Sequence, residues 1–255
     1  MFVDVNGVRL HALSFGDGPR TLLAVGGWTG SWEVWEEPIA RLSAAGWRCI
    51  AYDHRGAGES PAGLADISVE AMVSDVVGVL DAFGVERCVV AGESQGGAIA
   101  QYAVARTPER FDGLILSAAT PTGRREGSSS FPDLCRTDYP AAVAAFVERC
   151  FPERDCEHVK RWAARNVLLR AEPDQAARIL EMWGDEAVTD VDASALGLPV
   201  LIVHGTADAI VPTDVSRALA QRLADVEIVE LEGAGHVPTM TRANEVVEAI
   251  QRRFD

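Results

Sequence analysis

The stretch from Cys88 to Tyr102 constrains the fold of this chain more than any other part of the sequence. An apolar run, Cys-Val-Val-Ala, leads into Gly92-Glu-Ser-Gln-Gly96, and an Ala-rich segment with a helical pattern follows directly. A Gly-x-Ser-x-Gly turn between a strand and a helix is typical of a nucleophile elbow, which holds the serine hydroxyl above the end of a sheet. Because the turn leaves no room for flanking side chains, glycine is predicted to be required on both sides. The sequence therefore predicts that Ser94 is presented at the carboxyl end of a buried strand.

Strand and helix patterns alternate through most of the 255 residues, which predicts an α/β fold. Because the strands read as nearly continuous apolar runs, we expect a mostly parallel sheet with helices on both faces. The alternation stops near residue 121, where helical segments rich in Ala, Arg and Glu begin, and it resumes near residue 195. Residues 1–120 and 195–255 are therefore expected to form one core, and residues 121–194 a helical insertion. Strands are expected at 2–6, 8–15, 21–25, 47–52, 87–91, 111–118, 199–203 and 226–231, and core helices at about 31–45, 68–84, 95–107, 213–223 and 241–254.

The charge of the chain limits the partners that it can bind. With 23 basic and 38 acidic side chains, the net charge is −15, which repels nucleic acids and anionic membrane surfaces. The first residues lack the basic and apolar regions of a signal peptide, and no run approaches the ~18 apolar residues of a membrane span. We therefore expect a cytoplasmic protein that binds neither nucleic acid nor membranes.

The five cysteines fit a reducing compartment. Cys49 and Cys88 lie in apolar strand-like runs, where a thiol packs as a small hydrophobe. Cys135, Cys150 and Cys156 lie in the insertion, at a spacing that matches no zinc site. Reduced thiols are expected, although a disulfide between Cys150 and Cys156 stays open.

A serine hydroxyl becomes a nucleophile when a base takes its proton and a third group orients that base. His236 is the expected base because it lies among small residues in a loop after the last predicted strand; the alternative is a cap on the final helix. Asp208 is the expected acid because it follows a buried strand at its carboxyl end; the alternative is an ordinary turn residue. His204 is expected to be a packing residue, and His54 to have a structural role near the site.

Two backbone N–H groups are expected to stabilise the oxyanion of a tetrahedral intermediate. One belongs to Gln95, directly after the serine, and the other to Trp28, in a Gly-Gly-Trp turn after the third predicted strand. Gly27, Trp28 and Trp32 are also expected to contact the substrate. These aromatic residues favour a mostly apolar cleft for a small or medium acyl, aryl or lactone compound.

The chain resembles the α/β-hydrolase superfamily over nearly its whole length. The resemblance rests on the order Ser94, Asp208, His236, on the glycine turn before Trp28, and on the pattern Asp53-x-Arg-Gly-x-Gly-x-Ser60. It implies the α/β-hydrolase fold, a mostly parallel eight-stranded sheet whose second strand is antiparallel, with the insertion as a helical cap. It also implies no cofactor, and it assigns the roles of nucleophile, acid, base and oxyanion donors to the residues just described.

Two positions depart from the usual pattern of this family. Gly26-Gly27 stands where relatives often have His-Gly, and Glu93 stands where they often have a histidine before the serine. A carboxylate beside the nucleophile could pair with a cation such as Arg55, be partly protonated, or join a structural polar network. Neither departure removes an atom that catalysis needs.

These features predict a serine hydrolase, similar to carboxylesterases and lactonases, that cleaves an ester or lactone through an acyl-enzyme. Because one fold serves many chemistries, three alternatives stay open: a hydrolase of carbon–carbon bonds in ring-cleavage products, a cofactor-free oxygenase, and a non-catalytic small-molecule receptor. A homodimer also stays open. The expected cap carries arginines, one of which could pair with a substrate carboxylate: Arg124, Arg125, Arg136, Arg149, Arg154, Arg161, Arg165, Arg170 and Arg178.

Overall fold

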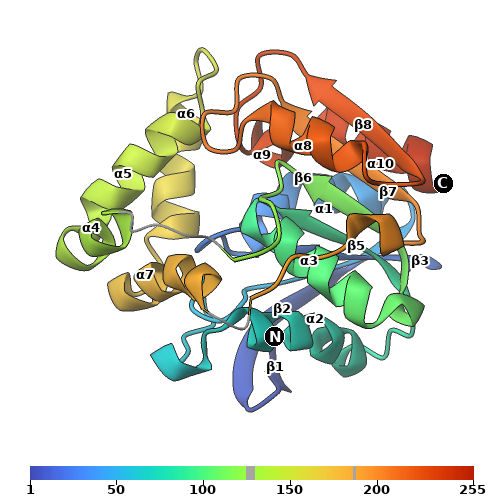
Figure 1. Ribbon diagram of the computed structural model, residues 1–255, viewed down its shortest axis with the longest axis horizontal. Helices are drawn as coiled ribbons and strands as arrows, with labels where there is room; N and C mark the ends of the chain where they lie inside the picture. Colours follow the sequence, from blue (N-terminus) through green and yellow to red (C-terminus); the bar gives the residue numbers. More distant parts are fainter. Residues whose placement is uncertain (125–129, 186–187) are drawn as a thin grey trace.

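The computed structural model describes residues 1–124, 130–185 and 188–255. Within these ranges, eight strands form one sheet in the order β1-β2-β4-β3-β5-β6-β7-β8 (Figure 1). Strand β2 is antiparallel to both of its neighbours, and all other neighbouring strands are parallel, which confirms the predicted topology. The strands are β1 Phe2–Val5, β2 Val8–Phe15, β3 Arg20–Val25, β4 Trp47–Tyr52, β5 Cys88–Glu93, β6 Phe111–Ser117, β7 Val200–Gly205 and β8 Val226–Leu231.

Helices cover both faces of the sheet. Helix α1 contacts α10, and α2 contacts α3, and these two pairs lie on opposite faces (Figure 1). Ser68 caps α2 as its pattern predicts, because its hydroxyl accepts a hydrogen bond from the N–H of Ala71 at 3.1 Å. The core helices are α1 Glu36–Ala44, α2 Val69–Ala82, α3 Gln95–Arg106, α8 Thr213–Ala220, α9 Pro238–Thr241 and α10 Ala243–Phe254.

Two predicted helices begin differently from the expectation. The first begins as a 3₁₀ turn, η1 Trp32–Trp35, and continues as α1. Pro38 lies in the first turn of α1, where backbone N–H groups have no partner within the helix, so its missing N–H costs no hydrogen bond. The last is divided into α9 and α10. In both cases the difference lies at the beginning of the predicted helix.

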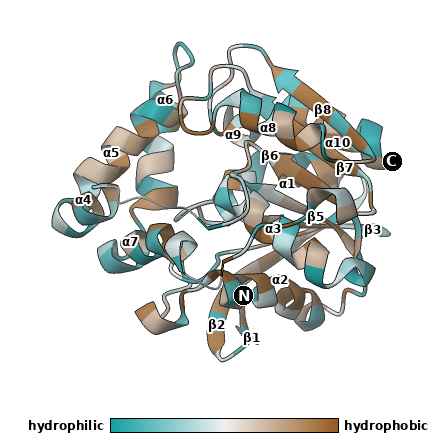
Figure 2. Cartoon of the chain, viewed as in Figure 1, coloured by the Kyte–Doolittle hydropathy of each residue, from teal (hydrophilic) through white to brown (hydrophobic). Residues whose placement is uncertain are grey.

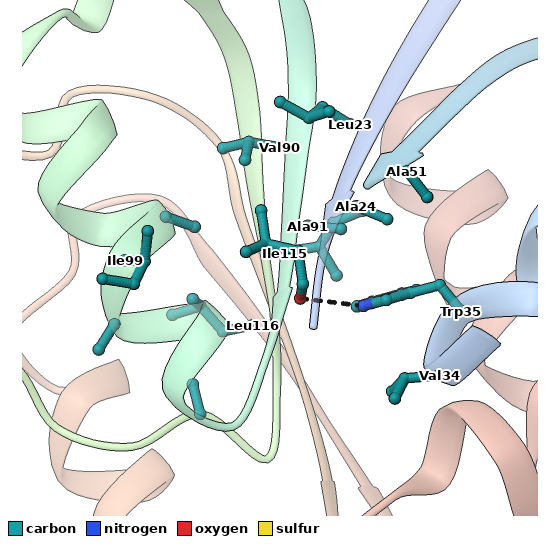
Figure 3. Packing of buried hydrophobic residues seen from close by; sticks show 14 of the residues in the cluster. Leu23, Ala24, Val34, Trp35, Ala51, Val90, Ala91, Ile99, Ile115 and Leu116 are labelled. Carbon is teal, nitrogen blue, oxygen red and sulfur yellow. Dashed lines mark hydrogen bonds between the residues drawn. The ribbon is translucent and has the colours of Figure 1, made fainter. Parts of the chain in front are cut away.

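Apolar side chains fill the space between the central strands and the helices. Strands β6 and β7 are largely apolar, whereas outward-facing helical surfaces are more hydrophilic (Figure 2). Ile99 of α3 packs on one face of the sheet and Trp35 on the other (Figure 3). The indole N–H of Trp35 donates to the carbonyl oxygen of Val25 at 3.2 Å, so this buried ring fixes the end of β3. The end of β3 leads into the glycine turn beside Ser94.

Among its described residues, the segment between β6 and β7 contains helices joined by loops, and no strand. Its helices lie beyond the carboxyl ends of the strands (Figure 1). They are α4 Phe131–Thr137, α5 Tyr139–Cys150, α6 Glu157–Trp162 and α7 Pro173–Glu181, with a π-helical turn at Ala163–Leu168. Arg170 ties this segment to the core because its guanidinium contacts Glu33 at 2.5 Å and Glu59 at 2.8 Å. The role of the segment as a cap stays a prediction.

All five cysteines are free, as expected, so the disulfide between Cys150 and Cys156 is not formed. Among the described residues, no helix combines the length and the apolar character that crossing a membrane requires.

Candidate active site

Ser94 lies in a strained turn between β5 and α3. Its φ of 51° and ψ of −119° are unusual for a residue with a side chain, and such strain costs on the order of 1–3 kcal/mol. Hydrogen bonds hold the turn: the N–H of Ser94 donates to Ser117 at 2.9 Å, and the carbonyl of Ser94 accepts from Thr120 at 3.0 Å. A Cβ at Gly92 would lie 2.3 Å from the carbonyl oxygen of Gly96, which bears out the predicted need for glycine.

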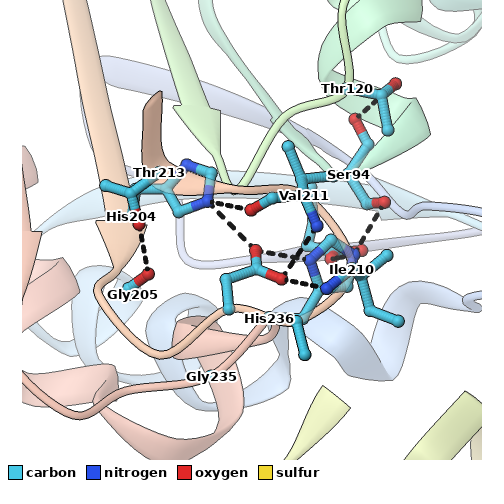
Figure 4. A network of polar contacts seen from close by, with 12 residues as sticks. Ser94, Thr120, His204, Gly205, Ile210, Val211, Thr213, Gly235 and His236 are labelled. Atoms are coloured by element: carbon cyan, nitrogen blue, oxygen red, sulfur yellow. Dashed lines mark hydrogen bonds and ion pairs between the residues drawn. The ribbon is translucent and has the colours of Figure 1, made fainter. Parts of the chain in front are cut away.

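Three side chains from distant parts of the sequence form one hydrogen-bonded chain (Figure 4). The hydroxyl of Ser94 lies 2.9 Å from Nε2 of His236, which comes from the loop after β8. Nδ1 of the same imidazole lies 2.8 Å from Oδ2 of Asp208, in the loop after β7. Ser94 is 6% exposed and His236 is 1% exposed, so these hydrogen-bonded side chains are shielded from bulk water. The structure thus brings together the nucleophile, base and acid that the sequence suggests.

Asp208 is fixed from several sides. Its Oδ1 accepts hydrogen bonds from the N–H groups of Ile210 at 2.8 Å and Val211 at 2.9 Å. Burial alone would raise the pKa of this carboxyl, but hydrogen bonds from His204 and His236 outweigh it and lower the pKa well below its usual range. Asp208 is therefore ionised at neutral pH and can stabilise a positive charge on His236.

His204 does more than pack in the core. Its Nε2 lies 3.0 Å from Oδ2 of Asp208 and 2.9 Å from the carbonyl of Val211 (Figure 4). Its Nδ1 lies 2.6 Å from the hydroxyl of Ser216. This support of the acid was not predicted from the sequence. The available signal was a polar side chain at the end of an apolar strand, four residues before the acid.

His236 has the properties of a base in this setting. Burial lowers its pKa, but the hydrogen bond to Asp208 and the charges of Glu93 and Asp208 raise it, whereas Arg149 lowers it; the net pKa lies above the ordinary 6.5. The imidazole therefore holds a proton more readily than a free histidine does. It is poised to accept the proton of Ser94.

Gln95 directly follows Ser94, and Trp28 borders the same cavities as Ser94; each carries a backbone N–H group. Within the described ranges, neither N–H group donates a hydrogen bond to another residue, so both are free to bind an oxyanion. The preceding turn is held from two sides: the N–H of Gly27 donates to Oε2 of Glu93, and Nε2 of His54 lies 3.2 Å from the carbonyl of Gly27. His54 thus has a structural role beside the site, as expected.

Trp28 also connects the core to the helical insertion. Its indole N–H donates to the carbonyl of Ala176 in α7 at 2.9 Å. Its ring packs against Phe131, Tyr139 and Phe146, with centroid distances of 5.4, 6.1 and 4.9 Å. These four rings, which we call the aromatic wall, therefore come from both the core and the insertion.

Two cavities meet at Ser94. The smaller, of about 30 Å³, is bordered by Gly27, Glu93, Ser94 and His236 together with apolar side chains of the insertion. The larger, of about 380 Å³, is bordered by Trp28, Ser94, Gln95, Thr120, Phe131 and Arg149. A hollow of about 660 Å³ elsewhere does not reach Ser94, so size alone does not identify the site.

Trp32 is not where the sequence analysis expects it. Its ring packs on Phe15 of β2, with centroids 5.6 Å apart, and the backbone N–H of Trp32 donates to the buried carboxylate of Asp53 at 2.8 Å. It borders neither cavity at Ser94. The structure therefore does not bring Trp32 to the cavities at Ser94, and its contact with a substrate stays a prediction.

Glu93 is buried next to the nucleophile, and its environment resolves two of the alternatives. Pairing with Arg55 is wrong, because that guanidinium binds the buried Asp75 at 2.6 Å and 2.9 Å. Glu93 instead accepts a hydrogen bond from Gly27 at 3.2 Å, and its Oε1 lies 3.7 Å from Nε2 of His236. Burial raises the pKa of Glu93 to about 7, opposed by the charge of His236, so the carboxyl is partly protonated near neutral pH.

Among the arginines of the expected cap, Arg149 stands out. It borders the larger cavity, and its guanidinium donates to the carbonyl of Ala209 at 2.6 Å. No carboxylate among the described residues pairs with it, whereas Arg136, Arg170 and Arg178 all have acidic partners. Arg125 lies outside the described residues. In the ranges that the structure describes, no cluster of His, Cys, Asp and Glu could hold a metal ion.

Comparison with known proteins gives consistent matches over the whole chain. The family described as "Serine aminopeptidase, S33" matches residues 19–241. A protein of Variovorax paradoxus named "Putative carbamate hydrolase RutD" is 32% identical over 235 residues, which cover 89% of this chain and 88% of that protein.

Two solved structures superpose closely. The enol-lactonase from Burkholderia xenovorans LB400 has a TM-score of 0.88 and 25% identity, with 99% of this chain and 98% of that chain covered. A thermophilic esterase from Thermogutta terrifontis also has a TM-score of 0.88 and 25% identity, with coverages of 99% and 97%.

Proposed function

The chain belongs to the family described as serine aminopeptidase S33, within the α/β-hydrolases, and from this premise we propose that it cleaves a carboxylic ester or lactone through an acyl-enzyme on Ser94. The observation that carries the proposal is the unbroken chain of hydrogen bonds from Ser94 through His236 to Asp208. Ester- and lactone-cleaving enzymes among the structural neighbours support the same class of reaction.

Acylation uses the groups in a fixed order. Nε2 of His236 takes the proton of Ser94 as Oγ attacks the acyl carbon, and Asp208 stabilises the imidazolium that forms. The N–H groups of Trp28 and Gln95 bind the oxyanion, each a preorganised donor of the kind whose removal costs about 10²–10³ in rate. The imidazolium then gives its proton to the leaving oxygen.

The two cavities suggest what the substrate looks like. Because the smaller cavity, of about 30 Å³, borders His236, it suits a small leaving group or a water molecule. The larger cavity, of about 380 Å³, has room for the acyl chain, between the aromatic wall and Arg149. We infer a small or medium substrate with an apolar acyl part, and a carboxylate at its far end would pair with Arg149.

A carbamate is a second candidate substrate, because the relative with 32% identity carries that name. The same acyl-enzyme machinery would serve, with an amine instead of an alcohol as the leaving group. The larger cavity also leaves carbon–carbon bond cleavage of an anionic dienoate open, because Arg149 would bind its carboxylate.

Turnover of p-nitrophenyl acetate and butyrate, with Ser94→Ala as the control, tests the proposal. We expect release of p-nitrophenol by the wild type, and a loss of at least about 10³-fold in Ser94→Ala, the usual scale for a missing nucleophile. Retention of most of the turnover by a folded Ser94→Ala variant would rule out the acyl-enzyme. No turnover of any ester, lactone or carbamate by the wild type would favour the receptor alternative.

A further inference from the structure

Glu93 is a buried, ionisable side chain beside the nucleophile that takes no part in the chemical steps of acylation. Glu93 is 4% exposed, and it is the last residue of β5, directly before Ser94. Its Oε2 accepts the hydrogen bond from Gly27, but its Oε1 has no hydrogen-bond partner among the described residues. Because an unpaired buried carboxylate oxygen is costly, such an atom calls for a specific explanation.

The surroundings of this oxygen suit one small polar molecule. Glu93, Ser94 and His236 all border the cavity of about 30 Å³, and the remaining wall is mainly apolar. A water molecule needs roughly 10–15 Å³ of such space and two to four polar partners. Oε1 of Glu93 and Nε2 of His236, which lie 3.7 Å apart, are two of those partners. The cavity is therefore large enough for water.

We propose that Glu93 binds and orients, in this small cavity, the water molecule that hydrolyses the acyl-enzyme. The inference rests on the proposed function, because it assigns a residue to the second half of the same reaction. Glu93 acts as a positioning residue: Oε1 accepts a hydrogen bond from one hydrogen of the water, and Nε2 of His236 accepts the other.

This arrangement completes the hydrolysis. The water oxygen forms a bond to the acyl carbon while Nε2 of His236 takes one of its protons, and the carbonyl electron pair moves to the oxyanion. When the tetrahedral intermediate collapses, the bond between the acyl carbon and Oγ of Ser94 breaks, and Oγ takes the proton from His236. The products are a carboxylic acid and the free enzyme, so no further reactant is needed.

The contact with Gly27 allows the two roles of Glu93 to be separated. In Glu93→Gln, the side-chain oxygen can still accept from the N–H of Gly27, so the oxyanion turn and acylation are preserved. The amide nitrogen then replaces Oε1, and it donates a hydrogen bond instead of accepting one. The water can then no longer donate a hydrogen bond to this position and loses its orientation towards the acyl carbon. Deacylation alone is therefore expected to slow.

Rapid-quench kinetics with p-nitrophenyl butyrate measure both halves of the reaction. The release of p-nitrophenol gives the acylation rate, and the decay of the acyl mass on Ser94 gives the deacylation rate. For Glu93→Gln we expect acylation within about threefold of the wild type and deacylation slower by about tenfold to hundredfold, the scale of one hydrogen bond to a charged group. Acyl-enzyme should become the main quenched species.

Equal slowing of both steps in Glu93→Gln, or unchanged deacylation, would overturn the inference. Glu37→Gln, the same substitution at an exposed position on α1, is the matched control and should leave both rates unchanged. Should Glu93→Gln fail to fold, Glu93→Asp serves instead: it keeps the charge but withdraws the carboxylate by one methylene from both Gly27 and the water, so acylation should slow as well and deacylation should slow more than acylation. Failure of the proposed function would look different, since Ser94→Ala would then keep its turnover or the wild type would never carry an acyl group on Ser94.

Discussion

Replacing Glu93 by glutamine should change how the stability of the protein depends on pH. The pKa of this carboxyl rises from an ordinary 4.5 to about 7 in the folded protein, mainly because it is buried. Its pKa in the unfolded chain stays near the ordinary value. The folded state therefore holds the proton more tightly than the unfolded state over this range.

Buried Glu93 lowers the free energy of unfolding of the wild type increasingly as pH rises. As pH rises from 4.5 to 7, the carboxyl of Glu93 loses its proton in the unfolded chain. Folding must then either take up a proton at Glu93 or bury its negative charge, and both cost free energy. The penalty grows by about 1.36 kcal/mol per pH unit over a difference of about 2.5 units, or about 3 kcal/mol in total. Glutamine carries no proton to lose, so the variant avoids this penalty.

Urea unfolding of the wild type and Glu93→Gln at pH 5 and pH 8 measures the difference. We subtract the free energy of unfolding of the wild type from that of the variant at each pH. This difference should be larger at pH 8 than at pH 5 by up to about 3 kcal/mol, which means that the variant gains stability relative to the wild type. Taking the difference between the two proteins cancels the titration of all other groups that the substitution leaves unchanged. A difference that is the same at both pH values would refute a buried carboxyl with a raised pKa at this position.

Four further outcomes are expected. The rate of acylation should rise with pH through one step with a midpoint above 6.5, because His236 must be neutral to accept the serine proton and its pKa is raised; a flat profile from pH 5 to 9 would contradict this. His204→Leu should lower kcat about tenfold with little change in KM, since Asp208 loses a hydrogen bond; steady-state kinetics and a thermal melt separate this from unfolding. Gly27→Ala should lower kcat by about 10²-fold or more, because its Cβ would lie 2.7 Å from Oε2 of Glu93, and wild-type kinetics in this variant would be incompatible with the described turn. Arg149→Gln should raise KM about tenfold for monomethyl succinate but not for methyl butyrate in a pH-stat assay, and equal changes for both esters would argue against a carboxylate site.

The parts of the site that depend on local geometry could be predicted from the sequence. The glycines around Ser94 are required by a turn that no other residue fits, and His236 and Asp208 follow strands whose carboxyl ends share one edge of the sheet. The order of parallel and antiparallel strands followed from the resemblance to a family.

Features that depend on packing between distant segments could not be predicted. Arg55 was free to pair with Glu93 or with another acid, and only the position of Asp75 on α2 decides between them. The ring of Trp32 packs on Phe15 of β2 instead of bordering the cavities at Ser94, a contact without a periodic signal. The contact of His204 with Asp208 depends in the same way on the path of a loop.

Covalent labelling of the wild-type protein with a p-nitrophenyl alkylphosphonate tests the central claim most directly. Such a compound transfers its phosphonyl group to an activated serine and resists release by water, so the label persists for mass spectrometry. We predict one equivalent of p-nitrophenol per protein, a single phosphonyl group on the peptide that contains Ser94, and no labelling of Ser94→Ala. Labelling at another residue, or an unlabelled Ser94 in a protein that hydrolyses esters, would contradict the account.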